Sequence, residues 1–338
     1  MKNLLLVAMQ YRNGERIYPA IPLLSKDFNI DVFKCYQMHP SHRWVGDNDL
    51  RKLFDSLYSE YIKNVFLDFN EIDFSKYDCI LMEDNRRKAD GGILSAIYSK
   101  SKCLTIGCTH GSGDASYEID GHKKAWDKCF MFGKSSATES FHISGGIPCN
   151  DDLKKYQNIK KEHVLIICNF LGNRSVSSWV NFKRFDENFF NGINISRVQD
   201  KYQKKIVIKL KSRDDEHGYK HNINYLKSIL PKSLDYKVVV DCEDDNLLIA
   251  QSVAAIGAPS TLALKPIQLK IPTVLIKNFG QTGMFENYSN LIELDEDKVF
   301  KALDSPIDIE FIKNTIEGGL TFNSSEVFVK HIKSLPQK

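Results

Sequence analysis

The sequence predicts an α/β protein of two domains, each built on a parallel β-sheet. Its 338 residues exceed what one ordinary core holds and suit two domains of about 150 residues each. Short apolar runs recur along the chain, and the spacers between them leave room for crossover helices. The runs are rich in β-branched residues and apolar on both faces, which is typical of buried parallel strands. They form two series: residues 4–9, 31–36, 64–69, 79–82, 103–108 and 129–132, then 164–168, 206–210, 237–240, 254–257 and 273–276.

The clearest helical patterns lie in three of the spacers: residues 56–63, 187–204 and 218–230. The lysine-rich segment 150–162 separates the two series and is interpreted as the linker between domains. We therefore expect an N-terminal domain over residues 1–155 and a C-terminal domain over residues 156–305. Both would be Rossmann-like, with parallel sheets that face a central cleft. Charged helical patterns predict that residues 306–338 cross back onto the N-terminal domain.

Composition excludes several classes of protein. The net charge of +3 gives no reason to expect a nucleic-acid partner, and the apolar fraction of 42% is that of a globular protein. No apolar stretch approaches the roughly 20 residues of a membrane-spanning helix, and the apolar start is too short for a signal peptide. The eight cysteines include no CxxC pair, and several lie in strand-like runs, which indicates a reducing compartment. A cytoplasmic protein is expected, and its local basic runs suit peripheral association with the inner face of the membrane.

A turn with catalytic character follows the run at residues 103–108. It reads Thr109-His-Gly-Ser-Gly-Asp114, so a strand that ends here brings an imidazole to the carboxyl edge of a sheet. Open α/β sheets bind ligands at that edge, and histidine suits a general base or a cationic partner for phosphate. His110 and Asp114 are therefore the catalytic candidates, with Asp114 orienting the imidazole or contacting substrate. The alternative is a histidine that packs against a glycine turn.

The second series contains two turns suited to a phosphorylated donor. Gly257-Ala-Pro-Ser-Thr261 opens a helix, and helix N-termini bind phosphate through free amides and the macrodipole. Gly257, Ser260 and Thr261 are expected to hold the donor, although either hydroxyl can simply cap the helix. Basic residues at the exit of the run 206–208 suit a diphosphate, or form an exposed loop: Lys209, Lys211 and Arg213.

Two further strand-end loops are candidates for contact with an acceptor. Glu15 and Arg16 lie in the first loop, and Glu83 and Asn85 follow the run at residues 79–82. The acidic run 214–217 does not predict a metal site, because adjacent residues rarely converge on one ion. No GxGxxG, P-loop or GxSxG motif occurs, so no dinucleotide cofactor is expected.

Several of these segments resemble known families. The middle of the chain resembles the CDP-glycerol glycerophosphotransferase-like transferases at residues 103–111, 126–133 and 143–153. Residues 256–264 and 270–276 resemble the donor half of GT-B glycosyltransferases. The resemblance covers residues 100–155 and 240–280. It implies a GT-B fold, a nucleotide-activated donor of the CMP, CDP or UDP type, and a role in surface polysaccharide assembly. It also implies His110 as the catalytic residue and Ser260 with Thr261 as the donor-phosphate contact.

The chain departs from both families at the donor turn. Residues 258–262 read Ala-Pro-Ser-Thr-Leu where glycerophosphotransferases carry a Thr/Ser-Asp-Tyr-Ser-Ser run, which favours a sugar as cargo. Lys265 stands near the place of a glutamate that holds ribose in many GT-B enzymes, so the nucleotide stays open.

The function predicted from these features is that of a metal-independent glycosyltransferase. It would move a sugar onto a glycan or lipid-linked acceptor of a capsule, O-antigen or teichoic-acid-like polymer. Three alternatives remain: a CDP-dependent polyol-phosphate transferase, a non-hydrolysing sugar-nucleotide 2-epimerase, and a non-catalytic assembly protein that binds nucleotide sugars. The epimerase is included because residues 11–24 resemble the first loop of the UDP-N-acetylglucosamine 2-epimerases.

Overall fold

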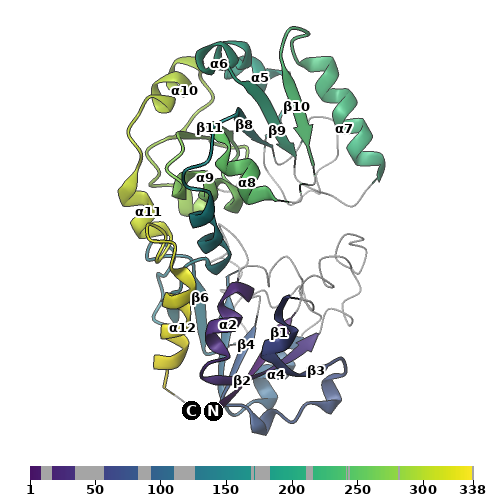
Figure 1. The fold of residues 1–338 in the computed structure, drawn as a ribbon, viewed down its shortest axis with the longest axis vertical. Helices are drawn as coiled ribbons and strands as arrows, with labels where there is room; N and C mark the ends of the chain where they lie inside the picture. Colours follow the sequence, from purple (N-terminus) through teal and green to yellow (C-terminus); the bar gives the residue numbers. More distant parts are fainter. Residues whose placement is uncertain are drawn as a thin grey trace. The chain divides into compact units, whose positions relative to one another are not determined.

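The protein divides into two compact units, each with its own parallel sheet (Figure 1). Unit 1 comprises Met1–Asp151 and Lys313–Lys338, and unit 2 comprises Asp152–Ile312. The structure is a computed structural model. At residues 93–95 and 216–222 it describes the backbone alone. It describes residues 1–8, 17–34, 57–82, 93–109, 126–168, 171, 183–210, 216–240, 242, 244–280 and 282–336.

The sheet of unit 1 has seven parallel strands in the order β3-β2-β1-β4-β5-β6-β7. Their bounds are β1 Lys2–Ala8, β2 Phe28–Lys34, β3 Ile62–Phe66, β4 Cys79–Met82, β5 Leu104–Cys108, β6 Lys128–Met131 and β7 His142–Ser144. The chain starts in the middle of the sheet and builds outward on both sides, as doubly wound folds do. The strand order therefore reverses between β1 and β4.

Two separate cores cover the faces of this sheet. Side chains of a strand point alternately to the two faces, so Leu4 and Leu6 belong to one core while Leu5 and Val7 belong to the other. The first core also takes Phe328 from α12 (Ser324–Ser334), whose ring lies 4.4 Å from the ring of Phe130. Burial on both faces explains why the central strands are apolar throughout.

Short helices complete unit 1. Among the residues that the structure describes, the α-helices of this unit besides α12 are α2 Ile21–Leu24 and α4 Ile93–Lys100. The 3-10 turns found there are η1 Tyr18–Ala20, η3 Ser59–Tyr61, η4 Phe69–Glu71, η5 Phe74–Lys76 and η7 Pro148–Tyr156, of which η7 continues into unit 2. Helix α12 packs against η1 and α2, so the end of the chain covers the part that follows β1.

The N-terminus of α12 is capped by a carboxylate far away in the sequence. The backbone N–H groups of Ser324 and Ser325 donate to the two oxygens of Asp151, at 2.8 and 2.7 Å. Asn323, which precedes the helix, makes no side-chain cap of its own. Asp151 thus fastens the returning C-terminal helix to the end of the first part of the chain.

We expect Asp151→Ala to lower the free energy of unfolding by about 2 kcal/mol, because two amides in a buried helix start lose their acceptor. In thermal denaturation this loss corresponds to roughly 4–8 °C. Asp152→Ala is the control, since Asp152 is exposed and pairs with Lys155 at the surface, at 2.6 Å. Equal melting temperatures for the two variants would contradict the role of Asp151.

The sheet of unit 2 has six parallel strands in the order β10-β9-β8-β11-β12-β13. Their bounds are β8 His163–Cys168, β9 Lys205–Leu210, β10 Tyr236–Val239, β11 Ser252–Gly257, β12 Thr273–Ile276 and β13 Leu291–Ile292. Here the strand order reverses between β8 and β11. The central strand β8 is buried at all its residues.

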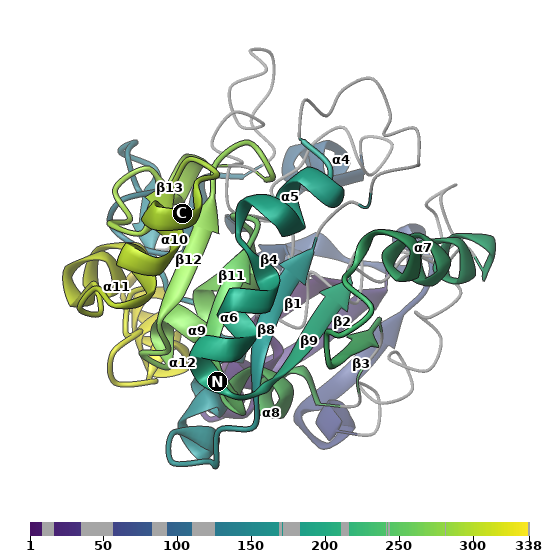
Figure 2. The ribbon, with the colours of Figure 1, turned by 90° about the horizontal axis from the view of Figure 1, so that it is seen from above.

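One face of this sheet carries a phenylalanine-rich core. Figure 2 shows α5 and α6 lying over the strands, and their residues Phe189, Phe190 and Val198 pack against Val164 and Ile206. The α-helices of unit 2 are α5 Glu187–Gly192, α6 Ile195–Tyr202, α7 Glu216–Ile229, α8 Asp245–Ala250, α9 Leu264–Gln268, α10 Glu296–Leu303 and α11 Ile309–Thr315, which runs on into unit 1. The 3-10 turns are η8 Thr261–Ala263 and η9 Gly283–Phe285.

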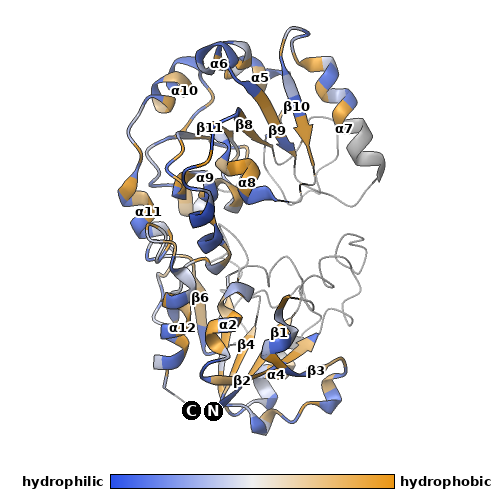
Figure 3. Ribbon diagram, in the orientation of Figure 1, coloured by the Kyte–Doolittle hydropathy of each residue, from blue (hydrophilic) through white to orange (hydrophobic). Residues whose placement is uncertain are grey.

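Hydropathy follows this layering. In Figure 3 the strands of both units are mostly hydrophobic, while the helices carry mixed polar and apolar residues. None of the helices in the described parts of the chain combines the length and the apolar character needed to cross a bilayer.

A buried histidine opens strand β8. His163 is 5% exposed, and its Nε2 has no hydrogen-bond partner among the described residues. Burial lowers the pKa of His163 from its ordinary value. The unfolded chain therefore binds the proton more readily than the folded chain, so stability is complete above pH of about 6.5 and falls as the pH drops below that value.

We expect the melting temperature to decrease as the pH falls below about 6.5, and to decrease less in His163→Gln. Glutamine keeps polar atoms at this position but does not titrate. Thermal denaturation followed across this pH range measures the difference. An unchanged pH profile in the variant would show that other groups cause the loss.

Candidate functional site

Ligands of open α/β sheets bind at the carboxyl ends of the strands, where the strand order reverses. In unit 1 that point lies between β1 and β4, and in unit 2 it lies between β8 and β11. Four predicted site residues follow the two strands at the unit 1 point, namely Glu15 and Arg16 after β1 and Glu83 and Asn85 after β4. Ser260 follows β11 at the unit 2 point.

The catalytic and acceptor candidates themselves lie outside the described residues: His110, Asp114, Glu15, Arg16, Glu83 and Asn85. The approach to His110 is described. Strand β5 is fully buried, and the N–H of Thr109 donates to the carbonyl of Phe130 at 2.8 Å. His110 therefore comes next after a residue still bonded to the neighbouring strand, and the roles of all six residues stay predictions.

The turn after β11 holds a hydroxyl group that has no partner in the described parts of the chain. Ser260 is the extended residue before η8 and makes no side-chain bond to the helix. Its Oγ is buried and has no hydrogen-bond partner among the described residues. A buried polar atom left unpaired costs about 1–3 kcal/mol, and such atoms indicate a ligand or a water. The helix-cap alternative for Ser260 is thus not what the structure shows.

Gly257 ends β11 in close contact with the neighbouring strand. A β-carbon at this position would lie 2.2 Å from the carbonyl oxygen of Ile167 in β8. The next residue continues the contact, because the N–H of Ala258 donates to the same carbonyl at 3.1 Å. Strand packing alone therefore requires glycine here, whatever binds at the turn. The contact of Gly257 and Thr261 with a donor stays a prediction.

Lys209 is held inside unit 2 near the end of β9. Its Nζ donates to the carbonyl of Val240 at 2.6 Å and lies 3.3 Å from Oδ1 of Asp245, and its side chain is 8% exposed. The ammonium group thus ties β9 to the connection between β10 and α8. Its direct contact with a diphosphate stays a prediction, and Lys211 and Arg213 lie outside the described residues.

The start of α8 belongs to a polar network that sequence reasoning missed. Asp244 accepts from the N–H of Leu247 at 2.8 Å and from the hydroxyl of Tyr156 at 2.5 Å. Nζ of Lys265, in α9, donates to Oδ1 of Asn246 at 2.7 Å. Three elements distant in the sequence therefore meet at the first turn of α8. The acidic run of residues 243–245 after β10 was the only signal for it.

Charge in this network is fixed by hydrogen bonds. Although burial opposes ionisation, the bonds from Tyr156 and from the backbone of Leu247 and Asn246 lower the pKa of Asp244. The same bond to Asp244 raises the pKa of Tyr156 to about 12. At neutral pH Asp244 is an anion and Tyr156 is its donor.

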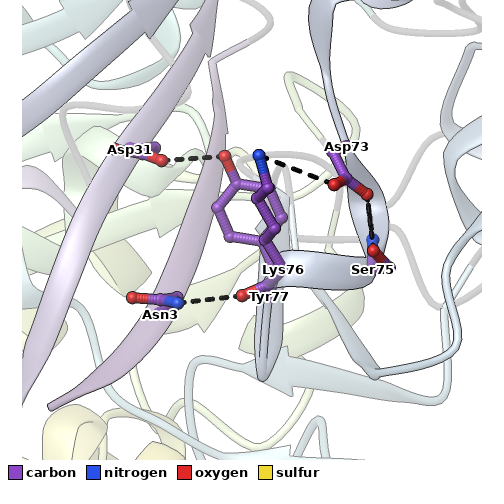
Figure 4. Close-up of polar contacts among 6 residues, drawn as sticks. All are labelled: Asn3, Asp31, Asp73, Ser75, Lys76 and Tyr77. Carbon is purple, nitrogen blue, oxygen red and sulfur yellow. Dashed lines mark hydrogen bonds and ion pairs between the residues drawn. The ribbon is translucent and has the colours of Figure 1, made fainter.

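Unit 1 contains a second polar cluster, and Figure 4 shows all of its residues except Asn64. The hydroxyl of Tyr77 donates to Asp31 at 2.8 Å, and Asn64 donates to the other oxygen of Asp31 at 2.9 Å. Nearby, the amide of Asn3 donates to the carbonyl of Lys76 at 2.9 Å. Burial raises the pKa of Tyr77. Because these groups satisfy one another and tie η5 to β1 and β2, the cluster is structural.

Metal ligands do not gather in the parts of the chain that are described. Among those residues, no group of three or more His, Cys, Asp or Glu could hold a metal ion. Asp214 and Asp215 lie outside them, and the side chains of Glu216 and His217 are not described. Metal independence stays a prediction.

Comparison with known proteins gives matches to solved structures alone. No protein-family model matches the sequence, and no curated protein matches it. A UDP-GlcNAc 2-epimerase from Methanocaldococcus jannaschii has a TM-score of 0.61 at 14% identity, covering 98% of this chain and 99% of that one. The epimerase from Neisseria meningitidis bound to UDP-GlcNAc has 0.60 at 13%, covering 98% and 100%. The wall teichoic acid polymerase TagF, in a variant form, has 0.51 at 12%, covering 98% and 89%.

These likenesses confirm the predicted fold class. The protein has a GT-B-like fold of two Rossmann-like units with parallel sheets. That the two sheets face a common cleft stays a prediction.

The predicted glycosyltransferase is wrong as the main interpretation. Several of the similar structures are UDP-GlcNAc 2-epimerases, so the comparison favours the epimerase that the sequence left as an alternative. The reason is physical. A strand followed by a glycine turn and a helix is suited to hold a diphosphate in any GT-B-like enzyme. Such motifs therefore identify the fold and the type of ligand, but leave the reaction open.

Proposed function

We propose that this protein binds a UDP-sugar and inverts the configuration at carbon 2 of the sugar, as a non-hydrolysing 2-epimerase. The observation that carries the proposal is the match to epimerases over nearly the whole of both chains, with one of them bound to UDP-GlcNAc. An enzyme of this kind needs no acceptor, so Glu15, Arg16, Glu83 and Asn85 would contact the sugar.

In unit 2 the turn at Ser260 is the proposed diphosphate site. It lies at the point of strand reversal, and its buried hydroxyl lacks a partner among the described residues. A phosphate oxygen would supply the missing acceptor. The backbone N–H groups at the start of η8 would add further donors.

In unit 1 we assign the proton transfer to the end of β5. Because no carbonyl adjoins carbon 2, we propose that its proton leaves together with UDP, so that the electron pair of the C–H bond forms a double bond between carbons 1 and 2. A proton then returns to carbon 2 from the opposite face as UDP adds again to carbon 1. His110 would take or give one of these protons, because its ordinary pKa lies near neutrality. Asp114 would orient the imidazole.

Exchange of the hydrogen on carbon 2 with solvent tests the proposal. The protein is incubated with UDP-GlcNAc in D2O, and the products are followed by NMR. We expect deuterium at carbon 2 and the appearance of UDP-N-acetylmannosamine up to a constant ratio. Binding of UDP-GlcNAc with no exchange and no new sugar would reject the epimerase and leave a nucleotide-sugar-binding protein.

Ser260→Ala tests the diphosphate contact. We expect the Kd for UDP to rise about fivefold, the scale of one hydrogen bond near 1 kcal/mol. The melting temperature without ligand should not fall, because the hydroxyl makes no bond to any of the described residues. Calorimetric titration and thermal denaturation measure the two effects. A lower melting temperature with unchanged affinity would show a structural hydroxyl instead.

A further inference from the structure

A carboxylate at the start of α8 is held by an ion pair but is not the cap of its helix. Asp245 is the first residue of α8, and its buried Oδ1 has no hydrogen-bond partner among the described residues. The ammonium of Lys209 lies 3.3 Å from that oxygen. The helix does not need Asp245 as its cap, because Asp244 accepts from the N–H of Leu247.

The remaining part of the Asp245 side chain is open. Its side chain is 38% exposed although Oδ1 is buried, so the exposure belongs to the other end, which includes Oδ2. Lys209 is 8% exposed and also donates to the carbonyl of Val240, so it cannot turn away easily. The result is a carboxylate with one oxygen beside a buried cation and a second oxygen that is exposed and makes no bond to the described residues.

Asp245 and Ser260 belong to the same corner of unit 2. Helix α8 packs against α9, and Lys265 of α9 donates to Asn246, the neighbour of Asp245. Ser260 begins the segment that leads through η8 into α9. This corner therefore carries both a hydroxyl and a carboxylate oxygen that are buried and lack hydrogen bonds among the described residues.

The carboxylate and the hydroxyl are suited to different parts of a nucleotide. A carboxylate repels phosphate but accepts hydrogen bonds from hydroxyl groups, and it is a usual partner for the hydroxyls of ribose in α/β nucleotide sites. The hydroxyl of Ser260 suits the diphosphate. We infer that Asp245 accepts hydrogen bonds from the ribose hydroxyls of the bound nucleotide and makes the site selective for ribonucleotides. Lys209 is the positioning residue that orients Asp245 and balances its charge.

This inference rests on the proposed nucleotide site of unit 2, and removal of the ribose hydroxyls from the ligand tests it. Kd values are measured by calorimetry for UDP and for 2′,3′-dideoxy-UDP with the full-length protein. We expect the wild type to bind UDP roughly 10- to 100-fold more tightly, the range for hydrogen bonds to a charged group. Asp245→Ala should bind both nucleotides alike, with the affinity that the wild type has for the dideoxy form.

Asp304→Asn is the control, because Asp304 pairs with Lys201 on the surface of the same unit at 2.7 Å. It should keep the wild-type preference for UDP. Equal affinities of the wild type for the two nucleotides would overturn the inference and leave the nucleotide site intact, even if Asp245→Ala failed to fold. A loss in Asp245→Ala that is the same for both nucleotides would also overturn it. No binding of either nucleotide by the wild type would instead reject the proposed nucleotide site.

Discussion

Replacement of His110 by alanine is expected to lower kcat for epimerisation by about 10²–10⁴-fold, the usual contribution of a general acid or base. The affinity for UDP should change little, because the proposed nucleotide site lies in unit 2. His110 is chosen for this test because of its position in the chain. Thr109 is still bonded to the neighbouring strand, and His110 is the next residue of the chain. Steady-state kinetics and calorimetric titration of the same variant separate the two effects.

Addition of imidazole gives this experiment its control. Free imidazole in the assay should restore part of kcat in His110→Ala if the missing group acts in proton transfer. His331→Ala serves as the matched variant, since His331 lies in α12 within the same unit. Its turnover should stay near that of the wild type. Normal turnover in His110→Ala with an intact fold would make His110 a packing residue and move the proton transfer to another group.

Much of the fold could be predicted because buried strands have a clear apolar pattern in the sequence. Strands β1, β4, β5, β8 and β11 are apolar on both faces, and each coincides closely with a predicted run. The two strands that were missed, β7 and β13, are short, lie at sheet edges and are only half-buried. An edge strand needs fewer apolar residues, so its pattern is weak.

The predicted helices were less accurate where the backbone conformation of a few residues sets the end of a helix. The pattern at residues 187–204 predicted one helix, but Asn194 adopts a left-handed conformation with φ of 47° and separates α5 from α6. The predicted helix at residues 56–63 is wrong at its end, because β3 begins at Ile62. Pairing with β2 overrides the local preference there.

Some features of the candidate site could likewise be predicted from the sequence, and others could not. Ser260 could be selected as a candidate because glycine and proline mark the end of a strand in the sequence itself. The network around α8 was missed, since Tyr156, Lys209 and Lys265 are far from Asp244 and Asp245 in the chain and only the fold brings them together. Lys209 was expected at a phosphate because of its place near the end of a strand. Its ammonium group donates to the carbonyl of Val240, and the phosphate contact stays a prediction.

Gly257→Ala is expected to destabilise unit 2 by about 3 kcal/mol, the upper part of the usual range for overpacking. The added carbon would lie 2.2 Å from the carbonyl oxygen of Ile167 and 2.9 Å from its carbonyl carbon. Both are backbone atoms of the central strand β8, which is hydrogen-bonded on each side and cannot move away. The melting temperature of the unit should fall by roughly 6–12 °C in thermal denaturation.

Gly192→Ala in the same unit separates backbone crowding from the general effect of replacing glycine. There the added carbon would meet the side chain of Leu294, whose Cγ would be 2.8 Å away, and that side chain can rotate. A smaller loss of stability is therefore expected for Gly192→Ala.

The two explanations of Gly257, strand packing and close approach to a nucleotide, predict different effects on UDP binding. If the glycine serves strand packing, stability falls first and the affinity for UDP changes only as the fold loosens. If Gly257→Ala melted like the wild type but bound UDP poorly, the glycine would be present to let the backbone approach the nucleotide, and the strands β8 and β11 would have room that the structure does not show.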